Sequence, residues 1–364
     1  MSSFAERADR LTTLVNEREL DLLVVSNLVN VRYLTGYTGT NGIVVLGTDV
    51  RVFGTDFRYY ERFKPRLTEY DVRRAKADIL EIPSKVVEEC RAGGTKLRVG
   101  FDDAHLTVRA HKRLGELVGE NAELVPSGGL VERLRAVKDA DEIERMREAA
   151  ALAAEAYDWL VSEHGLAGHT ERAVMLALER RATELGAEGV SFEPIVAAAE
   201  NGALPHAEPR EVEIPRDTLV VVDLGFLLDG YCSDCTRTYA TGSLDEEAVS
   251  VYLLVQEAQA AALAEVRAGA GRRELDGVAR RIIEDGGHGE EFWHGLGHGV
   301  GLEVHEEPRL TPRADGELLT GNAVTVEPGV YVAGRFGVRI EDLVVVTDDG
   351  CEILTPTSKE LTVV

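Results

Sequence analysis

The sequence predicts an α+β protein built from two domains, and three observations support that prediction. The chain has 364 residues, which exceeds the usual size of a single domain. Residues 1–130 alternate short apolar runs with amphipathic stretches, as is typical of an α/β domain. The rest of the chain combines stretches of helical periodicity with β-rich hairpins. The run Ser127-Gly128-Gly129 is the clearest break, so we expect domains at residues 1–129 and 130–364.

The first domain is predicted from its apolar runs and turn residues. An amphipathic opening helix leads into a buried strand over residues 21–27. Residues 42–49 and 50–55 then form a hairpin with Gly-Thr-Asp at its turn. Two later strands are expected at residues 97–102 and 122–128, with a helix between them.

The second domain begins with helical patterns. Residues 130–164 carry apolar side chains at three- and four-residue spacing, with Glu/Arg pairs on the opposite face. A further helix is expected over residues 171–185, and one long helix over residues 245–267. Strands fill most of the remainder.

Charge and hydropathy exclude several classes of partner. The formal net charge of −24 argues against nucleic acid or an anionic membrane. No run of about 18 apolar residues exists, so no membrane span is expected. Glu6 and Asp9 interrupt the opening segment, which lacks the apolar core of a secretory signal, and a cytoplasmic location is favoured.

Two aspartates occupy the arms of a predicted hairpin over residues 218–240. With Leu227-Leu228-Asp229-Gly230 as a four-residue loop, Phe226 lies opposite Tyr231 and Asp223 lies directly opposite Asp234. Opposed Cβ atoms on one face are about 4.5–5.5 Å apart. Two carboxylates at that distance repel each other unless a cation lies between them.

A second hairpin, over residues 324–342, repeats this arrangement with glutamates. A turn around Ala333-Gly334-Arg335 places Glu327 opposite Glu341. Pro328 cannot donate to a ladder, so the strand is expected to be bulged or at an edge there.

Histidines are concentrated between and before these hairpins. His294, His298 and His305 lie in a glycine-rich segment over residues 292–308, where glycine lets the backbone approach a site closely. The order of glycines required for a phosphate-binding loop is missing. His206 lies in a loop bounded by glycine and proline, a typical place for a residue that faces substrate.

Five of these residues form a ligand set for two metal ions, namely Asp223, Asp234, His298, Glu327 and Glu341. Oxygen-rich ligation with one imidazole suits hard divalent ions that hold a water for hydrolysis, and it fits Mn²⁺, Co²⁺ or Fe²⁺ better than a structural zinc. The sequence therefore predicts a dinuclear metallohydrolase.

Together these segments resemble the metallopeptidase family that includes Xaa-Pro dipeptidase (prolidase), aminopeptidase P, methionine aminopeptidase and creatinase. The resemblance implies a C-terminal pita-bread domain in which Asp234 and Glu341 bridge the two metal ions. Residues 30–42 and 55–62 look like the N-terminal domain of bacterial and archaeal Xaa-Pro peptidases. Methionine aminopeptidases generally lack such a domain, and creatinase lacks the full ligand set.

The resemblance also implies substrates, roles and an assembly. The expected substrates are small peptides with proline at the second position, and the expected assembly is a homodimer in which the Gly36-Tyr37-Thr38 loop reaches the partner's active site. By the family pattern Glu327 moves the proton of the attacking water, and His305 steadies the carbonyl oxygen. His206 contacts the substrate on the opposite side, while His294 and Arg339 orient ligands and loops.

The choice between two peptidases depends on one cation. A dipeptidase must bind the free carboxylate of a C-terminal proline, and Arg309 is the best candidate, although a solvated surface arginine is an equal alternative. We favour Xaa-Pro dipeptidase, with Xaa-Pro aminopeptidase (aminopeptidase P) as the alternative. A non-catalytic binding module on the same fold is the remaining class, and the retained ligands argue against it.

Overall fold

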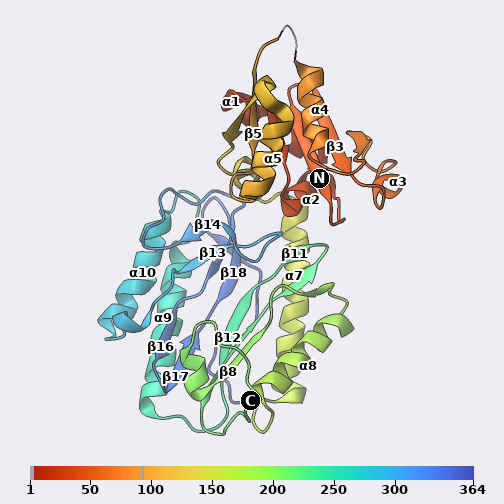
Figure 1. Cartoon of the computed structure of the whole chain (residues 1–364). Helices are drawn as coiled ribbons and strands as arrows, with labels where there is room; N and C mark the ends of the chain where they lie inside the picture. Colours follow the sequence, from red (N-terminus) through yellow and green to blue (C-terminus); the bar gives the residue numbers. More distant parts are fainter. Residues whose placement is uncertain (1–3, 92–93) are drawn as a thin grey trace. The chain divides into compact units, whose positions relative to one another are not determined.

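The computed structural model describes residues 4–91 and 94–364 and divides the chain into two compact units, Met1–Arg135 and Ala136–Val364 (Figure 1). Helix α6 (Leu130–Arg135) follows the sequence-based boundary at Gly129 and groups with the first unit. Both units mix helices and strands, as an α+β chain should.

The first unit is a six-stranded mixed sheet with helices packed on it. Its strand order is β4-β3-β2-β1-β5-β6. The strands are β1 (Leu22–Val25), β2 (Gly42–Gly47), β3 (Val50–Thr55), β4 (Asp71–Arg74), β5 (Leu97–Phe101) and β6 (Ala122–Pro126). The other helices are α1 (Phe4–Glu17), α2 (Leu28–Thr35), α3 (Tyr60–Phe63), α4 (Glu81–Cys90) and α5 (Val108–Val118), with a 3-10 turn at Gly119–Asn121.

The predicted elements of this unit are confirmed. The hairpin β2–β3 pairs Gly47 with Val50, which leaves Thr48-Asp49 as its turn. Strand β4 was not predicted, because its sequence Asp-Val-Arg-Arg lacks alternating apolar residues. It lies at the sheet edge, where charged side chains are tolerated and discourage further pairing.

The helical pattern predicted over residues 130–164 is confirmed for most of its length, but it is interrupted where the chain is extended between α6 and α7 (Ala140–Trp159). Val137 forms a β-bridge with Asn322, and the Lys138 N–H donates to the Gly321 carbonyl. Asp139 is the N-cap of helix α7, and its side chain accepts from two N–H groups of the first turn in a capping box. The Asp139 cap and the pairing of Val137 with Asn322 therefore interrupt the helix, although the periodicity of the sequence is helical.

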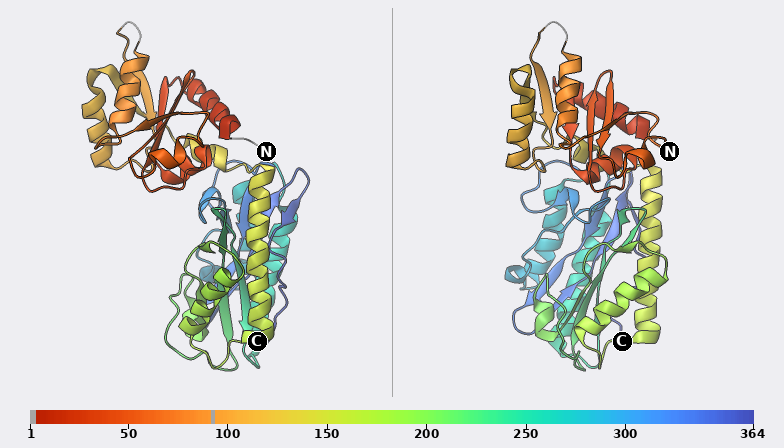
Figure 2. Two further views of the ribbon diagram at one scale, coloured as in Figure 1. Left: turned by 90° about the vertical axis from the view of Figure 1, so that its right-hand side faces the viewer. Right: turned by 45° about the vertical axis from the view of Figure 1, so that its right-hand side comes forward.

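The helices of the second unit pack on its strands in two pairs, and Figure 2 shows this unit from two further sides. Its remaining helices are α8 (Glu171–Glu184), α9 (Glu246–Glu265) and α10 (Arg272–Asp285), with a π-helical turn at Leu160–His164 and 3-10 turns at Ala199–Ala203 and Gly289–Glu291. One apolar core packs α7 and α8 against β8, β9 and β12. A second core packs α9 and α10 against β15 to β18.

The strands of this unit form four small sheets, ordered β11-β10-β7, β12-β9-β8, β14-β13-β15-β18-β19 and β16-β17. They are β7 (Gly189–Val190), β8 (Ile195–Ala198), β9 (Leu219–Leu224), β10 (Phe226–Leu228), β11 (Tyr231–Cys232), β12 (Cys235–Ala240), β13 (Gly297–Gly299), β14 (Glu306–Leu310), β15 (Ala323–Val326), β16 (Gly329–Val332), β17 (Phe336–Arg339), β18 (Asp342–Val346) and β19 (Cys351–Ile353).

Helix α10 corrects the expectation of a single long helix after residue 245. Its buried face consists of Leu275, Asp276, Ala279 and Ile283, and most of the other residues are charged. Because this buried face has only three apolar residues and includes the charged Asp276, the helical period is hard to recognise in the sequence. Across the residues that the structure describes, no helix is both long and apolar enough to cross a membrane.

Candidate metal centre

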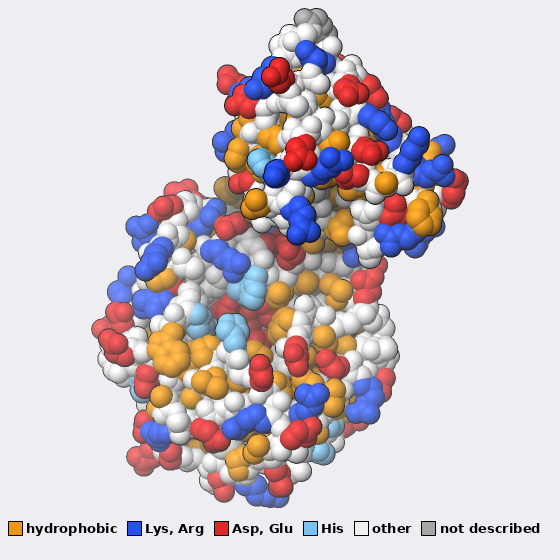
Figure 3. All heavy atoms as spheres, viewed as in Figure 1, with side chains coloured by type: hydrophobic (Ala, Val, Ile, Leu, Met, Phe, Trp, Pro, Cys, Tyr) orange, Lys and Arg blue, Asp and Glu red, His pale blue; other side chains and the backbone are white. Residues whose placement is uncertain are grey.

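A pocket of about 490 Å³ in the second unit gathers every residue predicted to act at the site. Its lining includes Asp223, Asp234, His298, Glu327, Glu341, His206, His294, His305, Arg309 and Arg339. Figure 3 shows a hollow on this unit with histidine side chains around a floor of acidic side chains.

The first hairpin brings its aspartates together in a different register from the predicted one. Leu228, not Phe226, lies opposite Tyr231, and Thr236, not Asp234, lies opposite Asp223. The turn is the two-residue Asp229-Gly230, with φ of 48° and 81°. Positive φ at both positions is the signature of a type I′ turn, which matches the twist of the two strands better than a four-residue loop does.

This register error leaves the two aspartates near each other. The shift moves the partner of Asp223 by two residues, from Asp234 to Thr236. Since side chains alternate between the faces of a strand, an even shift preserves the face. Asp234 therefore becomes a diagonal neighbour of Asp223 instead of a direct one, at the interruption between β11 and β12.

The second hairpin has the predicted register. Val326 pairs with Asp342 and Gly329 pairs with Arg339, so the residues between them place Glu327 opposite Glu341. The ladder is interrupted beside Pro328, as its missing N–H requires.

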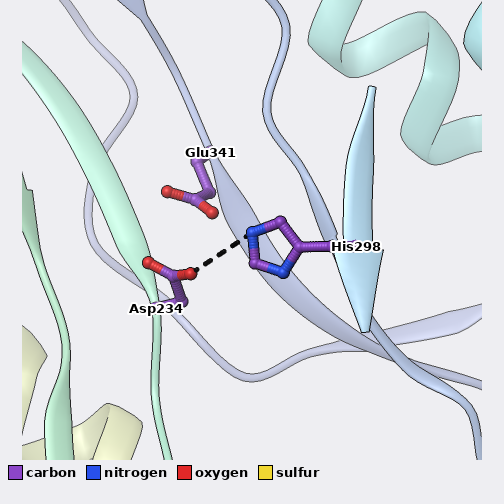
Figure 4. A group of neighbouring side chains, drawn as sticks. All are labelled: Asp234, His298 and Glu341. Atoms are coloured by element: carbon purple, nitrogen blue, oxygen red, sulfur yellow. Dashed lines mark ion pairs between the residues drawn. The ribbon is translucent and has the colours of Figure 1, made fainter. Parts of the chain in front are cut away.

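His298 faces the carboxylates from the short strand β13. Its Nδ1 lies 3.1 Å from the Gly299 carbonyl oxygen, which can only accept, so Nδ1 carries the proton. Its Nε2 lies 3.1 Å from Glu327 Oε1 and 3.7 Å from Asp234 Oδ2. The ligand atoms of Asp234, His298 and Glu341 lie within 4.8 Å of one another, and Figure 4 shows the three side chains converging.

Glycine is required on both sides of His298 because β13 is tightly packed between its neighbours. A Cβ atom on Gly297 would lie 2.0 Å from the Thr325 carbonyl oxygen, and one on Gly299 would lie 2.2 Å from the Glu307 carbonyl oxygen. The glycine-rich segment therefore sets how closely His298 approaches the acidic cluster.

The pKa values of the carboxylates are shifted because these groups are buried and close to one another. Burial, with the charges of neighbouring carboxylates, raises the pKa of Asp234 and that of Glu341 well above their usual values. Burial also acts to raise the pKa of Glu327, but the hydrogen bond and charge of His298, with His294 and Arg339, outweigh it and lower that pKa to about 2.

A cation fits this set. Asp223 Oδ1 is buried, and no group among the described residues donates a hydrogen bond to it. A buried carboxylate oxygen without a donor carries a full desolvation cost unless a metal ion binds it. Divalent ions at the oxygens of these carboxylates would remove both the repulsion and that cost.

Arg339 holds two residues of the centre in place through hydrogen bonds. Its Nη2 donates to Asp223 Oδ2 at 2.7 Å, and its Nε donates to Thr236 Oγ1 at 3.0 Å. The Thr236 hydroxyl in turn donates to Glu341 Oε2 at 2.6 Å. Thr236 was not predicted as a site residue, although its position two residues after Asp234 could have indicated it.

A chain of hydrogen bonds links Arg339 to His294. Arg339 Nη1 donates to Tyr331 Oη at 2.9 Å, so the Tyr331 hydroxyl can donate onward to His294 Nε2, also at 2.9 Å. His294 Nδ1 donates to the Gly295 carbonyl at 2.8 Å. Tyr331 was missed in the sequence because a tyrosine in a strand carries no specific signal.

Helix α10 holds the backbone on both sides of His294. The Arg280 guanidinium donates to the carbonyls of Phe292 and His294 at 2.9 and 2.8 Å. Asp276 Oδ1 accepts from the Leu296 N–H at 2.9 Å. Long-range contacts of this kind could not be predicted from one sequence.

Three further predicted residues line the open part of the pocket. The ring of His305 packs edge-on against that of His298, with centroids 4.3 Å apart. Burial and the charges of His298 and Arg309 lower the pKa of His305 to about 4, so it is neutral near pH 7. The Arg309 guanidinium has no ion-pair or hydrogen-bond partner among the described residues. His206 lines the same pocket.

Comparisons with known proteins agree with this geometry. The model of metallopeptidase family M24 matches residues 144–348, and that of the creatinase/prolidase N-terminal domain matches residues 7–137. The chain belongs to metallopeptidase family M24. It is therefore a two-domain M24 metallopeptidase with a pita-bread C-terminal domain, and its family implies divalent metal ions.

Individual M24 relatives are similar over nearly the whole chain. Xaa-Pro dipeptidase of Pyrococcus furiosus is 34% identical over 98% of this chain and 99% of its own. The structure of an Xaa-Pro dipeptidase from Bacillus anthracis has a TM-score of 0.95 and 37% identity, with 100% of both chains covered. The structure of an X-Pro aminopeptidase from Thermotoga maritima has a TM-score of 0.88 and 34% identity, covering 98% of this chain and 100% of its own.

The raised carboxylate pKa values predict how metal stabilisation depends on pH. A group whose pKa is higher in the folded protein stabilises it at low pH, and that stability is lost as the pH rises through the folded value. The metal-free M24 centre should therefore become less favourable as the pH rises through these raised pKa values, while bound metal replaces the protons. The increase in Tm on adding Mn²⁺, measured by calorimetry, should be larger at pH 7.5 than at pH 5.5. An equal or smaller increase at pH 7.5 would contradict this account. Glu327, with its pKa of about 2, titrates outside this window.

Proposed function

We propose that this chain is an Xaa-Pro dipeptidase that uses two divalent metal ions. The single observation that carries the proposal is one pocket that holds the acidic cluster, His298 and the free guanidinium of Arg309. A cluster of hard ligands can bind the metal ions needed for hydrolysis. A free cation beside it can bind the carboxylate of a C-terminal proline. The relatives named Xaa-Pro dipeptidase support the same substrate.

The residues that would hold the metal ions are Asp223, Asp234, His298, Glu327 and Glu341. The oxygen-rich set favours Mn²⁺, with Co²⁺ or Fe²⁺ as alternatives. When bound, such a pair of ions polarises the substrate carbonyl and supplies a water of lowered pKa.

The protein's own groups carry the proton and steady the developing charge. Glu327 is ionised at neutral pH and accepts the proton of the attacking water, which it then delivers to the proline nitrogen. His305, neutral near pH 7, donates an N–H hydrogen bond to the carbonyl oxygen as charge develops there. His206 contacts the substrate on the opposite side of the pocket.

Proline explains why such a pocket is needed. Its nitrogen has no hydrogen and its ring fixes φ, so it cannot be bound as an extended strand in a ladder. Phe192, Ile195 and Val304 give the pocket apolar and aromatic walls against which a ring can pack.

Xaa-Pro aminopeptidase is the second candidate, since the structure from Thermotoga maritima is also similar. The two functions are separated by incubating the Mn²⁺-loaded protein with Ala-Pro and Ala-Pro-Ala. Cleavage of Ala-Pro with little cleavage of Ala-Pro-Ala is expected. Cleavage mainly of Ala-Pro-Ala would favour the aminopeptidase, and silence on both would contradict Xaa-Pro hydrolysis.

Arg309→Met should weaken binding of the dipeptide specifically. Removing the cation that pairs with the proline carboxylate should raise KM for Ala-Pro by about 10- to 100-fold, the loss expected for one charge-assisted hydrogen-bonded pair, and leave kcat within a few-fold. Steady-state kinetics measure this, with Arg313→Met as the matched control, since Arg313 is exposed and outside the pocket lining. An unchanged KM for Ala-Pro would show that Arg309 does not bind the proline carboxylate.

The proposal also includes a homodimeric assembly and a location in a reducing compartment. Family precedent suggests that the Gly36-Tyr37-Thr38 loop reaches the partner's active site. The described cysteines form no disulfide bond, which supports a cytoplasmic location.

A further inference from the structure

A buried carboxylate holds both ends of the segment that carries His206. Glu171, the first residue of α8, is 1% exposed. The Ala198 N–H donates to its Oε1 at 2.9 Å, and the Arg210 N–H donates to its Oε2 at 2.9 Å. One side chain thus closes residues 198–210 into a loop.

Side-chain donors from the same segment complete the binding of this carboxylate. Asn201 Nδ2 donates to Glu171 Oε2 at 2.9 Å. The Arg210 guanidinium adds Nε to Oε2 at 3.1 Å and Nη2 to Oε1 at 3.2 Å. An ionised carboxylate only accepts hydrogen bonds, so five converging donors match glutamate and no other side chain of this length.

The loop closed by Glu171 is tightly constrained along its length. Ala199 has a φ of 50°, a conformation that a non-glycine residue keeps only where its surroundings hold it. A Cβ on Gly337 of β17 would lie 1.8 Å from the Gly202 carbonyl oxygen, so the loop backbone packs directly on that strand. The Pro205 carbonyl accepts from Arg339 Nη1 at 3.1 Å.

We propose that Glu171 is a positioning residue that sets the place of His206 in the pocket. Glu171 itself is not among the described residues that line the pocket, whereas Pro205, His206 and Ala207 are. Its action on the substrate therefore passes through the loop. The inference rests on the proposed function, in which His206 contacts an Xaa-Pro peptide.

Glu171→Gln tests this with little change of shape. The glutamine NH₂ group must face donors at one of the two oxygen positions, and the charge of Arg210 loses its partner. We expect kcat/KM for Ala-Pro to fall about 10- to 100-fold, because a displacement of about 1 Å at a substrate contact can cost that much. The number of bound Mn²⁺ ions should not change, since the hydrogen bonds of Glu171 to other described residues go to Ala198, Asn201 and Arg210, and none of these is a proposed metal ligand.

A double-mutant cycle with His206→Ala separates positioning from general destabilisation. If Glu171 acts through His206, adding Glu171→Gln to His206→Ala should lower kcat/KM by no more than about threefold, because the contact is already gone. Two losses that multiply would overturn the proposal, as would loss of bound metal in Glu171→Gln alone.

Three further variants keep the test interpretable. Glu184→Gln removes a charge from an exposed position of the same helix and should leave kcat/KM unchanged. Glu171→Asp retains the charge and should recover part of the activity. If Glu171→Gln does not fold, Arg210→Met removes the guanidinium half of the contact and should show the same non-additivity with His206→Ala. Wild-type protein inactive on both Ala-Pro and Ala-Pro-Ala would instead overturn the proposed function, and this inference with it.

Discussion

Replacing Asp234 by asparagine is expected to lower kcat/KM for Ala-Pro by about 10⁴-fold, the order lost when a central catalytic group is removed. Asp234 lies among His298, Glu341 and Asp223, and in the proposed centre it is shared by both metal ions. An amide in its place binds a divalent ion far more weakly than a carboxylate does, so both activity and metal content should fall.

Asp229→Asn is the matched control for this variant. Asp229 is an exposed residue in the turn of the same hairpin, at a φ of 48° that asparagine also tolerates. Hydrolysis of Ala-Pro and metal content are measured in parallel. An Asp234→Asn protein that retains its metal and stays within tenfold of wild-type activity would show that Asp234 is not a shared ligand.

Arg339→Met is expected to cause the largest loss of stability in the site, on the order of 3–5 kcal/mol in the metal-free protein, as for removal of one partner from a buried ion pair. Arg339 is buried and pairs with Asp223 at 2.7 Å, so its removal leaves that carboxylate without a counter-charge. The hydrogen bonds to Thr236 and Tyr331 are lost as well.

Urea unfolding followed by circular dichroism measures this effect, with Arg335→Met as control. Arg335 lies in the turn of the same hairpin and forms exposed ion pairs with Asp245 and Glu247, which contribute about 0–1 kcal/mol. Its guanidinium also lies 5.2 Å from the centroid of the Phe336 ring. Added Mn²⁺ should restore part of the lost stability in Arg339→Met, because the metal supplies the missing positive charge. Equal stability of the two variants would show that Arg339 does not stabilise the centre.

The candidate site could be predicted from the sequence because its residues lie in short, distinctive segments. The register of the second hairpin followed from its turn, and Glu327 lies opposite Glu341 as predicted. In the first hairpin the loop length was misjudged, because the sequence does not show whether Leu227 and Leu228 belong to the turn or to the strands. The two-residue period of a strand kept Asp223 and Asp234 on one face despite that error.

The supporting contacts could not be predicted, since they join segments far apart in the chain. Glu171 and the loop around His206 meet across about thirty residues, and Arg339 and Asp223 meet across 116. No local pattern distinguishes a buried arginine or glutamate of this kind from a solvated one. The break before α7 was missed for a similar reason, because it depends on pairing of Val137 with the distant Asn322.

The most direct test of the account is the number of metal ions that the metal-stripped protein binds, measured by calorimetric titration with Mn²⁺ and checked by elemental analysis. Two ions per chain are expected for the wild-type protein, with activity on Ala-Pro returning as both sites fill. One ion or none per chain, in protein that hydrolyses Ala-Pro, would contradict the dinuclear centre formed by Asp223, Asp234, His298, Glu327 and Glu341.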